Sequence, residues 1–236
     1  MTTRPMVHRF GAPVVAVACT SLLLVSCVSG LVGSAVPPSM KAEVEPAAPL
    51  KITKDEATKI KVIAVAHLSG AAGQGAMMTS MMVSQVGGAD EIRLLTEALE
   101  KSGRFKIIAA RQFINAVADI RESFDHSLTG AQRLEVAGRA GRALNADAVL
   151  IFQSQDLSQG PTLGGTLVGG LVTGRTESTV LYRIEVVSSG SNAVLWSQQL
   201  KLNITYGVYS LPSEDATARA GILPLVDSLV KSFGER

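Results

Sequence analysis

The pattern of apolar and polar positions divides most of the chain into strands and helices. Residues 61–68 are almost all apolar, which is typical of a strand buried on both faces of a sheet. After an uncharged stretch, Ile92, Leu95 and Leu99 recur at helical spacing, and Gly103 is expected to end that helix. The pattern therefore predicts a buried strand followed by a helix.

A second strand and two further helices are expected next. Residues 105–109 have the composition of a strand, and apolar residues recur at helical spacing between 113 and 120. Thr129, with a Gln three residues later, forms a possible capping box at the start of a third helix. Gly138 and Gly141 share one face of that helix, so we expect it to approach the sheet closely.

Three strands and one helix complete the pattern. Residues 147–156 begin as a buried strand, and residues 178–187 alternate between apolar and polar positions. A turn of Ser, Gly and Asn leads into a strand over residues 193–205, so these three strands should form an antiparallel meander. Ser213 can cap a final helix, which Pro224 is expected to kink or restart.

These elements predict an α/β fold. We expect one domain over residues 59–236, with helices packed on a mixed sheet and an antiparallel meander at its C-terminal end.

The N-terminus has the layout of a secretory signal. Arg4 and Arg9 precede an apolar run over residues 11–25, and small residues follow it. Leu24-Val-Ser-Cys27 resembles the bacterial lipobox, in which Cys27 would be acylated after removal of residues 1–26. The alternatives are an ordinary signal peptide with a chance cysteine and an uncleaved membrane anchor. The apolar run is shorter than the roughly 20 residues that a membrane helix needs.

Cleavage would change the charge and cysteine content. Losing Arg4 and Arg9, and no acid, leaves 20 of the 22 Lys and Arg against 20 Asp and Glu. No basic field remains, so we expect no nucleic-acid partner. Cys19 would be lost and Cys27 would carry lipid, which leaves no thiol for a disulfide, zinc site or nucleophile. Val28, and not Asp, follows Cys27. By the sorting tendency of the lipoproteins that the lipobox resembles, this implies the outer membrane, with the protein facing the periplasm.

A tether is expected between the anchor and the domain. Residues 27–58 contain Pro37, Pro38, Pro46 and Pro49 among small residues. This composition is typical of chains that bury too little apolar surface to fold. The tether would reach roughly 30 Å if flexible.

The sequence holds no recognisable catalytic or metal-binding pattern. His67 and His126 have no His, Cys or paired carboxylates at ligand spacing, and the Gly-x-Ser-x-Gly motif is missing. Glycines after the first strand occur in the order G-x-x-G-x-G, which differs from dinucleotide and phosphate-loop motifs. We therefore predict a non-enzymatic protein with no cofactor except the lipid on Cys27, and with no metal site.

Two uncharged segments are candidate contact surfaces. The first follows the first strand and contains four methionines, which could pack under a loop or contact a partner: Met77, Met78, Met81 and Met82. The second, residues 160–174, is either a flexible loop or a segment for membrane or oligomer contact. Its candidate contact residues are Leu163, Gly165, Leu167, Gly169 and Leu171. In a single strand or helix its three leucines would share one face.

The order of these pieces resembles the curli secretion-channel lipoproteins (CsgG) and the related holdfast-attachment lipoproteins. The resemblance runs from about Lys61 to Thr205 and is carried by the strand at 61–65, the segment 99–108, the segment 146–151, the glycine-rich insertion and the segments 182–187 and 193–197. Penicillin-binding-protein activator lipoproteins share the same core layout.

The resemblance implies a non-enzymatic outer-membrane lipoprotein that forms rings. In the channel members, two hairpins of each subunit enter the membrane, and the loop after the first strand narrows the pore. Residues 160–187 correspond to the first hairpin and residues 69–88 to that loop. The chain departs from the pattern because residues 202–213 are too short to cross a bilayer twice and residues 69–88 hold no aromatic side chain.

Two functions are compatible with these features. The first is an oligomeric scaffold or accessory for the export, assembly or anchoring of a cell-surface structure. The second is a tethered periplasmic binding module that regulates an envelope partner such as a cell-wall synthase. The glycine-rich segment and the methionines favour the first, and the long tether favours the second.

Overall fold

The computed structural model describes residues 38–69, 88–157, 166–168, 171–173, 175–207 and 212–234, without the side chains of residues 69, 88, 89, 166–176 and 207. The chain divides into two units, residues 1–36 and residues 37–236. All of the described residues belong to the second unit.

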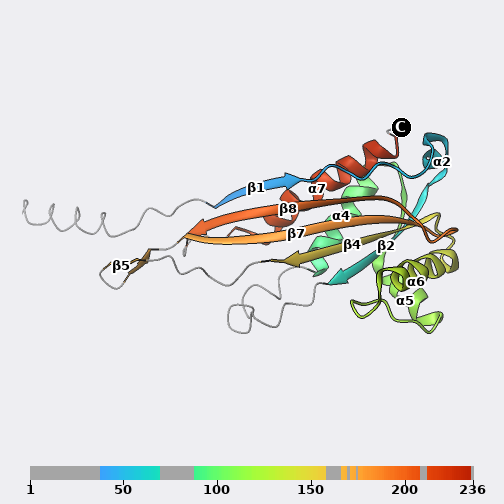
Figure 1. Cartoon of the computed structure of the whole chain (residues 1–236), viewed down its shortest axis with the longest axis horizontal. Helices are drawn as coiled ribbons and strands as arrows, with labels where there is room; N and C mark the ends of the chain where they lie inside the picture. Colours follow the sequence, from blue (N-terminus) through green and yellow to red (C-terminus); the bar gives the residue numbers. More distant parts are fainter. Residues whose placement is uncertain are drawn as a thin grey trace, which may run out of the picture. The chain divides into compact units, whose positions relative to one another are not determined.

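A mixed six-stranded sheet forms the centre of this unit. Its strands are β1 (Ser39–Val44), β2 (Val62–Ser69), β3 (Lys106–Ile108), β4 (Ala148–Asp156), β7 (Arg175–Ser188) and β8 (Val194–Gly207). They lie in the order β1-β8-β7-β4-β2-β3. Figure 1 labels β1, β8, β7, β4 and β2 in this order across the sheet. Strand β2 is parallel to β3 and β4, whereas β4, β7, β8 and β1 pair antiparallel in succession. The predicted α/β fold, mixed sheet and C-terminal meander are confirmed.

Five helices accompany the sheet in the described residues: α2 (Lys54–Lys59), α4 (Gly88–Lys101), α5 (Ala110–Asp119), α6 (Gly130–Ala143) and α7 (Glu214–Ser232). Thr129 and Gln132 form the predicted capping box of α6, and the Ser213 side chain caps α7. Helix α4 is followed by Gly103 in the left-handed conformation, with φ at 63°. Helix α7 continues through Pro224 without restarting.

The helices cover the two faces of the sheet with separate hydrophobic cores. On one face, α4 and α7 pack against residues that include Phe152, Tyr182 and Trp196. On the other, α5 and α6 pack against β2 and β4 around Ala66, Phe113 and Val149. The alternation of side chains along each strand supplies both cores at once.

The predicted tether is wrong for its second half. Residues 39–44 form β1 on the edge of the sheet, against β8. The next residues continue along β8, where the amides of Glu45, Ala48 and Lys51 donate hydrogen bonds of 2.9–3.0 Å to its carbonyls. The chain then forms α2, in which Ala57 is buried. We call residues 45–52 the strap. Proline is tolerated on a sheet edge, so Pro46 and Pro49 are compatible with the ordered structure of the strap.

Two glycines of α6 allow the predicted close approach. A methyl carbon added to Gly141 would lie 2.3 Å from the Ser189 hydroxyl and 2.8 Å from a Val149 methyl. At Gly138 it would lie 1.8 Å from the side-chain oxygen of Asn192. These distances are shorter than van der Waals contact. The turn between β7 and β8 thus packs directly against α6, in space that any side chain larger than that of glycine would occupy.

Candidate membrane-facing site

Four uncharged segments adjoin one end of the sheet. They are residues 28–38, 70–87, 158–174 and 208–213, which contain no Asp, Glu, Lys, Arg or His. We call this end the loop end: β1 and β7 begin there, at Ser39 and Arg175, and β2, β4 and β8 end there, at Ser69, Asp156 and Gly207.

The strand register establishes this placement. Ser39 pairs with Thr205 on β8, and Thr205 pairs with Glu177 on β7. Ser69, at the end of β2, pairs with Ser154 near the end of β4. The start of β1 therefore lies at the same end of the sheet as the start of β7 and the ends of β2, β4 and β8 (Figure 1).

Most of the predicted contact residues lie outside the described residues. These are Cys27, Met77, Met78, Met81, Met82, Leu163, Gly165 and Gly169. Leu167 lies in β5 (Thr166–Val168) and Leu171 in β6 (Leu171–Thr173), which pair antiparallel as a small separate sheet.

The pairing of β5 with β6 corrects one expectation about the leucines. Leu167 pairs with Val172, and Val168 pairs with Leu171. Paired positions share a face and successive positions alternate, so positions 167 and 171 fall on opposite faces of this hairpin. The chain reverses between the two positions, so the condition of a single strand or helix, under which the leucines would share one face, is not met.

A buried polar cluster lies near the loop end, beneath α4. Glu91, in the first turn of α4, is only 7% exposed and accepts a 2.7 Å hydrogen bond from the Ser154 hydroxyl. The buried Tyr182 side chain is its second hydrogen-bond partner. Burial raises the pKa of the Glu91 carboxyl, and the two hydrogen bonds lower it less. Burial, together with the nearby Glu91 carboxylate, also raises the pKa of Tyr182.

Sequence reasoning missed this cluster, although a signal was present. Glu91, Leu95 and Leu99 are spaced by four residues, so they lie on one face of α4. Leu95 and Leu99 are fully buried, and a carboxylate in line with them has to be buried too.

His67 lies near the end of β2 and stacks on Phe152, with ring centroids 5.8 Å apart. Its Nε2 is buried and makes no hydrogen bond within the described part of the chain. Burial lowers the pKa of the imidazole, and the charge of His126 lowers it further. His67 is thus kept neutral by its surroundings.

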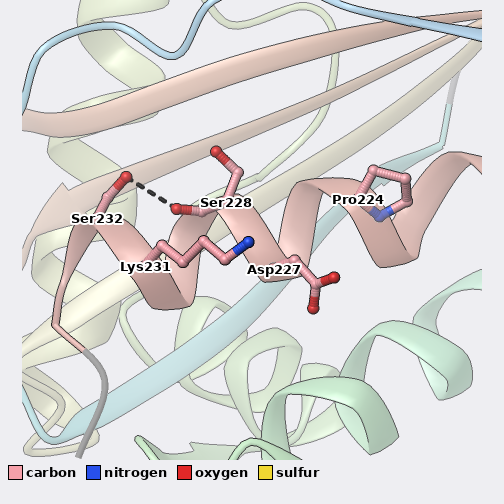
Figure 2. A pocket seen from close by; sticks show the side chains of 5 residues that line it. All are labelled: Pro224, Asp227, Ser228, Lys231 and Ser232. Atoms are coloured by element: carbon pink, nitrogen blue, oxygen red, sulfur yellow. Dashed lines mark hydrogen bonds between the residues drawn. The ribbon is translucent and has the colours of Figure 1, made fainter.

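Two shallow hollows of about 520 and 550 Å³ lie along the outer surface of α7. Figure 2 shows the smaller, lined by Pro224, Asp227, Ser228, Lys231 and Ser232. The larger lies between α4 and α7 and also reaches Leu223 and Lys101. Both are open, so neither encloses a small molecule.

In the residues that the structure describes, no group of three or more His, Cys, Asp or Glu side chains could hold a metal ion. No helix among them is long and apolar enough to span a bilayer.

Comparison with known proteins gives structural likeness and no family. No family model matches the chain, and no curated protein matches it. A PelC dodecamer from Paraburkholderia phytofirmans is 15% identical, with 81% of this chain and 96% of that chain covered and a TM-score of 0.36. The C-terminal domain of LpoB from Salmonella enterica is 12% identical, with coverages of 62% and 91% and a TM-score of 0.36.

Lipoprotein GNA1162 from Neisseria meningitidis is 16% identical, with 73% of this chain and 94% of that chain covered and a TM-score of 0.31. Similarities at this level assign no function, partner or assembly to the chain. The resemblance to the curli secretion-channel family therefore stays a prediction.

Proposed function

We propose that the chain is a non-enzymatic outer-membrane lipoprotein, anchored through Cys27, that acts next to the membrane as an oligomeric scaffold or accessory for a cell-surface structure. The observation that carries the proposal is that β1, which follows Cys27 in the sequence, begins at the loop end, where the strands that flank the uncharged segments also begin or end. The proposal gives the protein a lipid as its only covalent group and a membrane surface as its first partner.

The short distance between anchor and sheet supports a position close to the membrane. Because β1 begins at Ser39, only residues 28–38 separate Cys27 from the domain. A flexible segment of this length spans roughly 17–20 Å, well below the reach expected of the longer tether. A binding module that has to reach a distant envelope partner would need more chain than this.

The composition of the segments at the loop end supports the same orientation. A charged side chain costs several kcal/mol within the hydrocarbon region, whereas glycine, leucine, valine and methionine do not carry that penalty. With the lipid at the loop end, β2 and β4, which residues 70–87 and 158–174 follow in the sequence, would end on the side that faces the bilayer. These residues are the proposed membrane or subunit contacts.

Vesicle binding tests this orientation. We would compare residues 37–236 with a variant that carries Leu163→Ser, Leu167→Ser and Leu171→Ser, and with a control that carries Ile114→Ser and Leu223→Ser. Ile114 and Leu223 are exposed apolar residues on helices α5 and α7. For the triple variant alone, the fraction that floats with phospholipid vesicles and the particle size in solution should both decrease. Its melting temperature should stay unchanged. A monomer that never floats would favour the tethered regulator.

Anchoring is tested separately in cells. Mass spectrometry should find Cys27 as a lipidated N-terminus, and Cys27→Ala should release the protein from the outer membrane. Insertion of about 30 flexible residues after residue 30 should impair function if the protein works close to the membrane. An unmodified N-terminus, or full function with the longer tether, would contradict the proposal.

A further inference from the structure

The buried carboxyl group of Glu91 has an unusual set of neighbours. Its hydrogen-bond partners are the hydroxyl groups of Ser154 on β4 and Tyr182 on β7. Within the described residues, no Lys, Arg or His side chain forms an ion pair with it. A buried carboxylate without a cation is costly, whereas a protonated carboxyl group with two hydroxyl partners is not.

The charged groups around the cluster do not supply the missing cation. On α4 itself, Arg93 is paired with Asp90 and Glu97, and on α7, Arg219 is paired with Asp215 at 2.6 Å. The titratable side chains from the strands, Asp156 on β4 and Tyr206 on β8, carry no positive charge. His67 on β2 stacks on the Phe152 ring and does not pair with Glu91. The N-terminus of α4 favours the charged form of the carboxyl group and so opposes the effect of burial, but it brings no side-chain cation.

We propose that Glu91 is a protonation-dependent latch that holds the first turn of α4 against β4 and β7 when neutral and releases it when ionised. The sheet side of the latch is rigid, since Tyr182 is 1% exposed and its ring lies against Gly221 of α7, where an added methyl carbon would be 2.2 Å away. The helix side can move alone because Leu95 and Leu99 fix the later turns of α4 in the core.

The direction of the response follows from linkage. Burial raises the pKa of Glu91, so the closed state binds the proton more tightly than the open state does. The stabilisation is complete below the ordinary pKa of a glutamate, about 4.3, and is lost as the pH rises through the higher value of the closed state. Acidification therefore closes the latch and neutral pH loosens it.

Hydrogen exchange tests the latch in the purified full chain, kept in detergent. Peptides that cover residues 90–95 would be followed by mass spectrometry between pH 4.5 and 8, in the wild type, Glu91→Gln and Glu97→Gln. Glutamine keeps the shape of the neutral side chain and cannot ionise. Glu97 is exposed on the same helix and serves as the matched control.

Comparing variants at the same pH removes the intrinsic pH dependence of exchange. Glu91→Gln should match the wild type at pH 4.5 and be more strongly protected than the wild type at pH 8, because only the wild-type side chain can ionise and so loses the stabilisation of the closed state. Glu97→Gln should match the wild type throughout. Equal protection of Glu91→Gln and wild type at pH 8 would overturn the proposal.

A second measurement covers the case in which Glu91→Gln does not fold. Carbon NMR of the side-chain carboxyl groups in the wild type should give Glu91 a titration midpoint above the ordinary pKa of a glutamate, about 4.3. A midpoint at or below that value would overturn the latch. The latch depends on contacts within the fold and not on the membrane. The latch can therefore fail while the proposed function holds, and the proposed function can fail while the latch holds.

Discussion

The guanidinium group of Arg104 donates hydrogen bonds from Nε and Nη2 to the same carbonyl oxygen, that of Phe233, at 3.3 and 3.1 Å. Arg104 also donates to the carbonyls of Gly234, Ile60 and Ala57. One buried side chain thus joins the C-terminal ends of two helices. The acceptors at the end of α7 lie 129–130 residues from Arg104 along the sequence, and those at the end of α2 lie 44–47 residues from it.

Replacing Arg104 should therefore destabilise the domain strongly. Hydrogen bonds from a charged donor contribute about 1.5–3 kcal/mol each, and unsatisfied buried carbonyls add a cost. We expect Arg104→Met to lower the free energy of unfolding by at least about 3 kcal/mol in urea denaturation. Lys101→Met, an exposed cation nearby, is the control and should change stability little. A loss below about 1 kcal/mol would show that water replaces the guanidinium.

Truncation tests whether the strap belongs to the domain. A chain that begins at Lys59 lacks β1, the strap and nearly all of α2, and it exposes apolar surface that Met40, Leu50 and Ile52 cover. Each of these partly buried side chains contributes up to about 1.5–3 kcal/mol. Thermal unfolding should start well below that of a chain beginning at Pro37, which should match the longer protein. Equal melting temperatures of the two truncated chains would mean that the residues before Lys59 contribute nothing to the stability of the domain and belong to the tether.

The close packing of α6 can be tested with two glycines of one helix. Alanine is about 1 kcal/mol better than glycine in a helix interior, so Gly→Ala stabilises wherever there is room. Gly130 has no atom within 4 Å of an added methyl carbon, whereas at Gly141 that carbon would overlap Ser189 and Val149. Gly130→Ala should be neutral or slightly stabilising, and Gly141→Ala should cost about 1–3 kcal/mol. Similar effects at both positions in chemical denaturation would contradict the observed contact.

His67 should make the domain less stable in acid. Its pKa is lowered in the folded state, so below about pH 6.5 the unfolded chain takes up a proton that the folded chain does not. Stability is then lost as the pH falls, opposite in sign to the effect of Glu91. His67→Gln cannot titrate, so its free energy of unfolding relative to wild type should improve between pH 7.5 and 5. A constant difference would mean that the imidazole titrates equally in both states.

Periodicity predicted the architecture because local patterns dictate it. The alternation at Tyr182, Ile184 and Val186 placed three side chains on one face, and all three are buried there. The capping box at Thr129 and the left-handed Gly103 are signals within a few residues, which the structure confirms.

Long-range packing was beyond the reach of local patterns. Strand β1 has exposed side chains at five of its six positions, so it shows no burial period, and its place depends on the ladder with β8. The Glu91 cluster depends likewise on three elements that meet only in the fold. The lipidation of Cys27 and the contact role of the four methionines remain predictions from the sequence.

The way in which β1 enters the sheet has a mechanical consequence. The strand begins at the loop end and runs away from it, antiparallel to β8. Tension on Pro38 directed outward at that end acts along the strand, perpendicular to its ladder hydrogen bonds. Such a load shears the six paired residues together, whereas a load across the strand would peel them one by one. A domain held at Pro38 would therefore transmit force into the sheet through all six pairs of β1 and β8 before its edge strand gives way.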